Sequence, residues 1–590
     1  MRTDPIQFYT ENKAGLETEL SALKKTVYGV SVLRLFVFFS SVFGVYYFLG
    51  NGAYVAVVVV SGVSIFTFLL LKSAKMKTQK ALLVAKIEIN ATEISVLKGK
   101  YGNLKSGDEF ADSQHFYSND IDLFGMGSFF QYSNRTVTQE GAEAYAKRLT
   151  ENRIDEIEER QDAIQELATK VSWRQHFSAI ATLVNVHLSS TTIVTYINDY
   201  EAKLPTRLGF FTKVFSFVSL ALIALVFFDL VAFSMLLSWF LLGLFITVIQ
   251  LKKTNAIYAK SSKAKETFQQ YHVLLEAIEN QSFSSSLLRR KQQEIQTESE
   301  KASRVFRKFS KILDAFDQRN NILIAILGNA LFLWDIQNAL KVEKWIKRYG
   351  HTVENWFEVI AFFDAENTLA NFHYNHPTFV MPAIGSTSTI IDAKGLGHPL
   401  LHSDKRIVND FLINNEHFFI VTGANMAGKS TFLRAVSLTV VMANMGLPVC
   451  AKKMVYTPIK LITSMRTSDS LKDDESYFYA ELKRLKCIVD AIESHKYFII
   501  LDEILKGTNS KDKAIGSKNF VEKLIISNST GIIATHDVSL CSLEDMYRGI
   551  ENYFFDAQIH KDELSFDYTL KKGICKNMNA SFLLRKMKII

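Results

Sequence analysis

Proline and cysteine are both scarce in this chain of 590 residues. Its seven prolines leave long stretches without a residue that breaks helices, which favours long helices and apolar segments. The four cysteines form no Cys-x-x-Cys pair and lie far apart, at Cys450, Cys487, Cys541 and Cys575. This spacing argues against a zinc site and favours a reducing compartment.

The chain also has only a small excess of one charge. Its formal net charge of +8 is modest for this length and suits a nucleic-acid or anionic-lipid surface. Lysines beside membrane segments would produce the same excess. The length leaves room for several domains and a large core. Composition therefore leaves both classes of partner open.

Two apolar runs near the N-terminus are each long enough to cross a hydrocarbon layer of roughly 30 Å. Residues 27–49 contain one charge, Arg34, residues 53–71 contain none, and residues 50–52 (GNG) predict a tight turn between them. Both flanks are expected in the cytoplasm, because lysines lie on both sides of the pair and none lies in the turn. These lysines are Lys24, Lys25, Lys72, Lys75, Lys77 and Lys80. The double span and the missing cleavage site argue against a signal peptide, and a buried soluble hairpin is the remaining alternative.

A second apolar block runs over residues 214–251 and is interrupted only by Asp229. It predicts two more spanning helices, 210–228 and 230–251, that turn at Asp229, and basic residues on both sides give the same orientation. Asp229 at a turn is expected to be an interface residue rather than an ion site. The spans have almost no polar lining, which favours anchoring over conduction.

The other segments divide into helical parts and one mixed part. From Lys252 to about Asn371 the pattern is helical and polar-rich, with a break at residues 281–286, and after Pro377 it changes to short strands and turns. A candidate basic stripe for nucleic acid, which is more often a solvated face, contains Lys260, Lys263, Lys265, Arg289, Arg290 and Lys291. We expect an N-terminal helix at residues 1–26, a transmembrane hairpin at 27–72 and a first part of a helical core at 73–209. A second transmembrane hairpin is expected at residues 210–251, a second core or lever part at 252–376, and an ATPase domain at 377–590.

The most informative stretch lies in the last of these parts. Residues 418–421 predict a buried strand, residues 423–430 (GANMAGKS) have the G-x-x-x-x-G-K-[ST] spacing, and an amphipathic helix follows from Thr431. In this order, backbone N–H groups can surround phosphate oxygens at a helix N-terminus. Lys429 is expected to reach the β- and γ-phosphates, and the Ser430 hydroxyl to bind Mg²⁺. The expected nucleotide-binding residues are Gly423, Ala424, Asn425, Met426, Ala427, Gly428, Lys429, Ser430 and Thr431.

Two further predicted strands end in polar residues. The run at residues 497–501 precedes Asp502, which is expected to hold the Mg²⁺ shell, and Glu503, which is expected to polarise the attacking water. The run at residues 530–534 precedes His536, which is placed to sense the γ-phosphate. Acidic pairs often only cap helices and single histidines are usually structural, but their position downstream of the loop favours function.

Together these motifs resemble the ATPase domain of the MutS mismatch-repair family. Residues 422–431 (TGANMAGKST) are similar to its phosphate loop, in which Asn-Met is an unusual pair. Residues 502–510 (DEILKGTNS) and 534–536 (ATH) are similar to its acidic strand end and its histidine switch. Residues 476–481 (SYFYAE) resemble its signature segment, and Asn409 matches a residue that lies near the adenine.

The resemblance implies a fold, an activity and partners. The fold would be an α/β phosphate-loop ATPase domain of the ABC-like MutS type with an all-α core or lever domain, here with two transmembrane hairpins. The activity would be hydrolysis of ATP with Mg²⁺ in a homodimer paired through the ATPase domains, where Ser476 completes the neighbouring subunit's site. Double-stranded DNA would be the partner, in mismatch repair or damage sensing. The residues involved would be the catalytic Lys429, Glu503, His536 and Ser476 and the metal-binding Ser430 and Asp502.

The chain departs from the family pattern at both ends and near the signature. Residues 1–110 hold an apolar hairpin where the mismatch-reading domain is expected, and the chain ends at Ile590 without the family's dimerising segment. Asp474 replaces a family Gly, and Ser464 replaces a family Arg. The leading hypothesis is a membrane-anchored, dimeric MutS-like ATPase that acts as an ATP-driven clamp or switch. The alternative is a membrane ATPase that transmits dimer closure to its spans, in remodelling or transport, without reading DNA.

Overall fold

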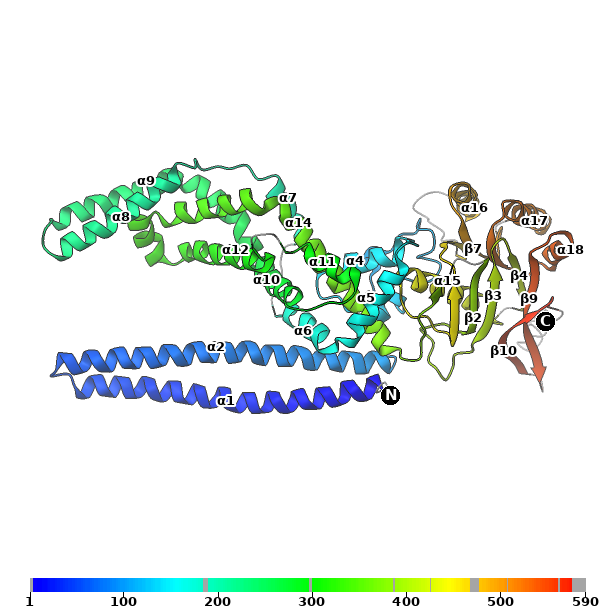
Figure 1. Cartoon of the computed structure of the whole chain (residues 1–590), viewed down its shortest axis with the longest axis horizontal. Coiled ribbons are helices and arrows are strands. Elements are labelled where there is room, and N and C mark those ends of the chain that lie inside the picture. The colour runs from blue at the N-terminus through cyan, green and yellow to red at the C-terminus, as the bar shows by residue number, and fades with distance from the viewer. Residues whose placement is uncertain are drawn as a thin grey trace.

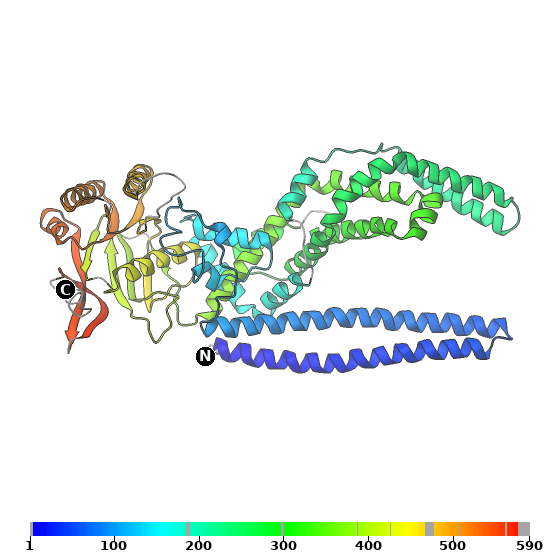
Figure 2. The same cartoon turned by 180° about the vertical axis from the view of Figure 1, so that it is seen from behind.

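The computed structural model describes residues 4–183, 189–296, 300–385, 388–424, 426–466, 477–506, 508–560 and 563–575. These residues form an elongated molecule (Figure 1). A mixed α/β part lies at one end, a body of helices lies in the middle, and two helical hairpins reach the opposite end (Figures 1 and 2). Four helices in these hairpins are long and apolar enough to span a membrane.

The first hairpin consists of two continuous helices, α1 (Pro5–Tyr47) and α2 (Gly52–Leu97). The predicted turn between them is confirmed, and the Asn51 side chain accepts hydrogen bonds from the first backbone N–H groups of α2. With 43 and 46 residues, the helices are each about 65–70 Å long at about 1.5 Å per residue. They are therefore longer than a bilayer requires, and their polar parts run back along the helical body (Figure 1).

Buried polar side chains fix the open end of the first hairpin to the helical body. The Tyr9 hydroxyl donates to Asn375 Oδ1 over 2.8 Å, and Asn375 Nδ2 donates to Glu93 Oε2 over 2.7 Å. Glu93 also forms an ion pair of 2.6 Å with Arg135. Removing one partner would leave a buried charge or hydrogen-bonding group unpaired, so this junction favours one geometry.

The second hairpin consists of α8 (Leu208–Phe227) and α9 (Phe233–Ser261). Asp229 lies in the turn, as predicted, with φ of 55° and an exposed side chain. The predicted bounds of the second helix are wrong at both ends. It starts later because residues 228–232 form the turn, and it continues past residue 251 because residues 252–261 contain no helix breaker.

The helical body is built around α14 (Trp334–Asn375), which has 42 residues. Helices α10 (Lys265–Glu279) and α12 (Ala302–Asp317) pack against α14 and against each other. Aromatic rings fill the core between them, as where Phe309 stacks on Trp345 with ring centroids 3.8 Å apart. Because α14 begins beside the second hairpin and ends at the α/β part, it connects the two (Figure 1).

Shorter helices complete the body. The predicted break at residues 281–286 is confirmed, since α10 ends at Glu279 and α11 begins at Ser286. The short helices are η1 (Asp108–Phe110), α3 (Phe129–Ser133), α4 (Gln139–Thr150), α5 (Ile157–Thr169), α6 (Val171–Ala181), α7 (Ser190–Asn198), η2 (Ser262–Ala264), α11 (Ser286–Gln293), η3 (Gln318–Asn320), η4 (Ile324–Gly328) and α13 (Asn329–Phe332).

The α/β part contains two sheets. The larger has the strand order β10-β9-β4-β8-β7-β6, with β10 antiparallel to β9 and all other neighbours parallel. The smaller has the order β1-β5-β2-β3. The strands are β1 (Ala383–Ile384), β2 (Thr389–Leu396), β3 (Asn409–Asn414), β4 (Phe418–Gly423), β5 (Lys453–Tyr456), β6 (Lys460–Ser464), β7 (Tyr497–Asp502), β8 (Thr530–Ala534), β9 (Ile550–His560) and β10 (Glu563–Lys572). The helices are α15 (Lys429–Met445), α16 (Tyr477–Ser494), α17 (Ser510–Ile526), η5 (Val538–Ser542) and α18 (Leu543–Met546).

The three strands predicted around the site are confirmed as β4, β7 and β8, whose residues are almost all buried. Burial on both faces is usual for parallel strands covered by helices. Helix α15 begins at Lys429, two residues before the predicted start at Thr431, because Gly428 in the left-handed conformation is its N-cap. The chain is thus helix-rich with mixed α/β sheets, as predicted at this level.

Candidate functional site

The carboxyl ends of three parallel strands meet at one edge of the larger sheet. β4 ends at Gly423, β7 ends at Asp502, and β8, which lies between them, ends at Ala534, just before Thr535 and His536. This edge is where ligands bind in open α/β sheets. The predicted residues from distant sequence positions are therefore gathered here, beside a cavity of about 480 Å³.

The loop between β4 and α15 depends on glycine at both ends. Gly423 has φ of 154°, and a Cβ there would lie 2.7 Å from the carbonyl oxygen of Phe555. Gly428 has φ of 101°, and a Cβ there would lie 2.9 Å from the Tyr568 ring. Only glycine fits both positions without strain. The loop and helix residues that line the cavity are Ala424, Met426, Ala427, Gly428, Lys429, Ser430 and Thr431.

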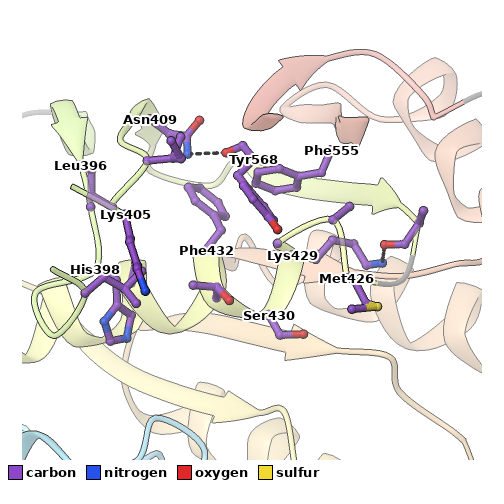
Figure 3. A pocket seen from close by; sticks show the side chains of 18 of the residues that line it. Leu396, His398, Lys405, Asn409, Met426, Lys429, Ser430, Phe432, Phe555 and Tyr568 are labelled. Atoms are coloured by element: carbon purple, nitrogen blue, oxygen red, sulfur yellow. Dashed lines mark hydrogen bonds between the residues drawn. The ribbon is translucent and has the colours of Figure 1, made fainter. Parts of the chain in front are cut away.

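Lys429 points back into the loop (Figure 3). Its ammonium donates to the carbonyl oxygen of Gly423 over 2.6 Å and to that of Ala424 over 3.2 Å, and it lies 3.3 Å from His536 Nε2. Burial lowers the pKa of Lys429, because the charged form loses hydration there. The charge is held by neutral carbonyl groups, so an anion in the loop would be a stronger partner.

Ser430 and Asp502 bring two oxygen atoms together at the entrance to α15. The Ser430 hydroxyl donates to Asp502 Oδ2 over 2.6 Å, and burial raises the pKa of Asp502. A hydroxyl and a carboxylate fit Mg²⁺, which prefers oxygen ligands and keeps positions for water and phosphate. Within the described parts of the chain, no group of three His, Cys, Asp or Glu side chains could hold a metal ion alone. The donor set therefore fits Mg²⁺ that arrives with phosphate.

Glu503 and His536 form a close pair beside the cavity. His536 Nε2 lies 2.9 Å from Glu503 Oε1. The hydrogen bond from His536 is the main reason that the pKa of Glu503 is lowered to about 2. Glu503 also has φ of 52°, a conformation that non-glycine residues rarely adopt and that is found most often at functional sites. This carboxylate is therefore ionised at neutral pH.

An aromatic side chain that sequence reasoning missed forms one wall of the cavity. Tyr568, on β10, lies over the loop, opposite Leu396 and His398 (Figure 3). Asn409 also lines the cavity, and both ends of its amide hold β10. Asn409 Nδ2 donates to the Tyr568 carbonyl over 3.2 Å, and Asn409 Oδ1 accepts from the Leu570 N–H over 2.8 Å.

One further acidic side chain positions the loop after Glu503. Glu481, on α16, is buried and accepts hydrogen bonds from the backbone N–H groups of Leu505 and Lys506. It belongs to the predicted signature segment, and its role is to hold that loop next to the acidic strand end. The predicted residues Asn425 and Ser476 lie outside the described residues, as does Asp474.

Comparison with known proteins agrees with these motifs. Residues 419–585 match the family model of MutS domain V. This part of the chain, less than a third of its length, is therefore similar to MutS domain V. It is 31% identical over 220 residues to a DNA mismatch repair protein MutS of Alkaliphilus oremlandii (36% of this chain, 24% of that protein). It is 30% identical to human MutS protein homolog 4 over 193 residues (31% and 20%) and to the MutS of Thermotoga neapolitana over 237 residues (39% and 29%).

The chain spans only about a quarter of the length of these MutS relatives. The matched MutS domain V contains the loop, the acidic strand end, His536 and Tyr568, whereas Asn409 lies before it. The similarity to MutS domain V therefore covers most of the residues around the cavity, whereas the four apolar helices lie outside it.

Proposed function

We propose that the chain is a membrane-anchored MutS-type ATPase that binds ATP with Mg²⁺ at this cavity and hydrolyses it as a homodimer. The observation that carries the proposal is the meeting of Lys429, the Ser430–Asp502 pair and the Glu503–His536 pair at one sheet edge. The four apolar helices of the same chain support the membrane anchor. The N-terminus, the helical body and the α/β part would then lie in the cytoplasm, as the flanking lysines favour.

Each pair at the cavity has a part in this proposal. The loop N–H groups and Lys429 would bind the phosphates, and Ser430 and Asp502 would hold Mg²⁺. Bound Mg²⁺ would supply neutralisation of the phosphate charge. Glu503 would take the proton of the attacking water, and His536 would orient Glu503 and keep it ionised. Ser476 of a second copy would complete the site, as the family resemblance implies.

ATP turnover by the detergent-solubilised full chain tests the proposal. We expect Glu503→Gln to lower the turnover rate about 10²–10⁴-fold while ATP still binds, because the variant lacks only the proton acceptor. Lys429→Ala should weaken ATP binding itself. Glu493→Gln, which removes an exposed charge on α16 of the same domain, is the matched control and should hydrolyse ATP at the wild-type rate. Equal turnover by the wild type and all three variants would exclude the assignment.

A second candidate function is transmission of closure to the membrane helices. Its support is α14, a single helix about 63 Å long at about 1.5 Å per residue that runs from the second hairpin to the α/β part. At its far end Asn375 bonds to both helices of the first hairpin, through Tyr9 and Glu93. In vesicles, nucleotide-dependent changes in cross-linking between the hairpins would favour this function, and their absence would favour a passive anchor.

Binding of double-stranded DNA is proposed because relatives are named DNA mismatch repair proteins. The basic stripe expected from the sequence is partly neutralised, since Lys265 pairs with Asp314 and Asp317, and Lys291 pairs with Glu294. A better surface for phosphates is the outer face of α12 and α14. Its exposed cations are Arg304, Arg307, Lys311, Lys341, Lys344, Lys347 and Arg348.

Binding to a duplex at increasing salt concentration tests this surface. We expect affinity to fall steeply with salt and to drop further when Lys344→Glu and Lys347→Glu are combined, because each phosphate contact releases counterions. The pair Lys511→Glu and Lys523→Glu on α17 changes the net charge equally and should bind like the wild type. Absent binding to matched and mismatched duplexes at low salt would remove DNA from the proposed function.

A further inference from the structure

A short apolar segment lies between α12 and α14, in a stretch that the sequence analysis took as polar-rich. Residues 321–333 read NILIAILGNALFL and contain no charge. In the structure they form the π-helical turn η4 and the short helix α13. The segment is too short to cross a bilayer, and apolar stretches of this length are typically buried, interfacial or re-entrant.

Contacts with α9 give the position of this segment along the second hairpin. Just before the segment, Asn320 Nδ2 donates to the Tyr258 hydroxyl over 2.7 Å, at a level beyond Lys252. Near its other end, Ala330 lies so close to α9 that a Cβ on Gly243 would be 2.0 Å from the Ala330 carbonyl oxygen. Gly243 is the middle of the apolar part of α9, about 15 Å from Phe233 and about 14 Å from Lys252 at about 1.5 Å per residue. The segment therefore descends along α9 to half the depth of that apolar part.

The side chains that face away from the hairpin are large and exposed. Ile322 is 72% exposed, Leu323 64%, Ile326 45% and Leu327 48%. Clusters of exposed aliphatic side chains of this size usually mark a contact with lipid or protein. They continue the apolar surface of the second hairpin, because α13 packs against both α8 and α9.

The polar groups of the segment are paired internally. Asn329 Nδ2 donates to the Ala325 carbonyl over 3.0 Å, and Asn329 Oδ1 accepts from the Asp335 N–H over 2.9 Å. The two ends are joined by an ion pair of 2.9 Å between Arg319 and Asp335, whose side chains are 11% and 3% exposed. The Asn329 amide and the charges of Arg319 and Asp335 thus have partners within the protein, which polar side chains at membrane depth require.

We propose that residues 321–333 form a re-entrant segment that enters the lipid layer from the cytoplasmic side and ends near its middle, against the acyl chains of one leaflet. This inference rests on the membrane anchor of the proposed function. Lipid is the favoured partner because the segment lies beside the apolar middle of α9, which would itself be surrounded by acyl chains. After Leu333, with φ of 50°, the chain turns back, and Gln337 Nε2 donates to Ser216 Oγ of α8 over 2.8 Å.

Depth-dependent fluorescence quenching tests the proposal. The full chain, with Cys487→Ser to remove the partly exposed native thiol, would carry one added cysteine labelled with an environment-sensitive fluorophore. The labelled variants are Ile326→Cys, Phe245→Cys on the exposed apolar face of α9, and Lys344→Cys on the exposed face of α14. Each is reconstituted in phosphatidylcholine vesicles that contain a spin label on the acyl chain, and aqueous iodide is added to a parallel sample.

The proposal expects the acyl-chain label to quench the fluorophore at Ile326→Cys about as strongly as at Phe245→Cys, and several-fold more strongly than at Lys344→Cys. Aqueous iodide should instead quench the fluorophore at Lys344→Cys most strongly. If Phe245→Cys is quenched by the lipid label and Ile326→Cys is not, the re-entrant segment is overturned while the anchor stands. If neither quencher reaches the fluorophore at Ile326→Cys, protein covers this site, either a second copy or another chain, and the re-entrant segment is overturned as well. If Phe245→Cys is also unquenched, the membrane anchor itself fails.

Discussion

The charge of Glu503 depends mainly on two neighbours, His536 and Lys506. His536 donates to it, Lys506 lies 3.7 Å away, and together they keep the carboxylate ionised far below neutral pH. Lys429 and Asp502, at the same sheet edge, have pKa values shifted toward their neutral forms by burial. Within one small region, the pKa of Glu503 thus favours the charged form, whereas those of Lys429 and Asp502 are shifted toward the neutral forms. Perturbed pKa values of this kind cluster at functional sites.

At Tyr568 we predict a specific effect on nucleotide binding. Tyr568→Ala should weaken binding of ATP by roughly 5- to 150-fold, because stacking of a base on an aromatic ring is worth about 1–3 kcal/mol. Tyr568→Phe keeps the ring and is the control, with an affinity close to that of the wild type. Equilibrium binding of a fluorescent ATP analogue measures both. An unchanged affinity in Tyr568→Ala would show that the base binds elsewhere.

Among the elements, α14 makes the most varied contacts. Near its end Asp364 accepts hydrogen bonds from the Thr138 backbone and hydroxyl at the start of α4, over 2.8 and 2.7 Å. Gly141 allows this approach, since a Cβ there would lie 2.1 Å from Asp364 Oδ2. Just past the helix, His376 donates from Nδ1 to the Phe372 carbonyl over 2.8 Å, so its Nε2 accepts from the Tyr132 hydroxyl over 2.8 Å.

This arrangement at the end of α14 predicts a pH dependence of stability. Burial lowers the pKa of His376 to about 4, whereas the unfolded chain has an ordinary value of about 6.5. As pH falls below 6.5, the unfolded state binds a proton that the folded state does not, so stability is lost at about 1.4 kcal/mol per pH unit until pH approaches 4. The thermal unfolding midpoint of the solubilised chain should fall accordingly between pH 7.5 and pH 5.

His376→Gln keeps a hydrogen-bonding side chain without a titrating group. The His376→Gln variant should lose less stability than the wild type between pH 7.5 and pH 5. Its thermal unfolding midpoint at pH 7.5 is nevertheless expected to be lower than that of the wild type. His398, whose pKa burial also lowers to about 4, remains in both proteins and cancels in the comparison. Parallel pH profiles for the two proteins would contradict the assignment to His376.

For the whole molecule, the decisive feature is the direction of the hairpins. The turns of both hairpins lie at the same end, opposite the α/β part, in both views (Figures 1 and 2). A single flat lipid layer could therefore enclose all four apolar helices. The cavity would then lie far from the membrane surface, with α14 between them.

This layout predicts a topology that thiol labelling can measure. In intact cells, a membrane-impermeant reagent should label Asn51→Cys and Asp229→Cys, one in each turn, because both would face away from the cytoplasm. Lys311→Cys on α12 should react only after the cells are permeabilised. The chain should also resist extraction by alkaline carbonate. Labelling of the two turns from opposite sides, or release by carbonate, would contradict the anchor.

Much of the candidate site was predictable from the sequence because its signals are local. A strand, a glycine loop and a helix follow each other within residues 418–445, and the acidic and histidine positions each follow an apolar run directly. The four apolar helices were predictable for a similar reason, since length and composition determine whether a helix can span a membrane. Helix ends were less accurate, as at α9, where propensity extends the helix beyond its apolar part.

The sequence by itself determined the loop chemistry, the strand ends and the apolar helices, because each is written in neighbouring residues. The tertiary structure alone decided that Asn409 holds the strand of Tyr568, that Glu93 and Asn375 join a hairpin to α14, and that residues 321–333 reach the middle of α9. The physical reason is that these contacts join residues far apart in the chain, and which of them meet depends on how the whole chain packs rather than on any local pattern.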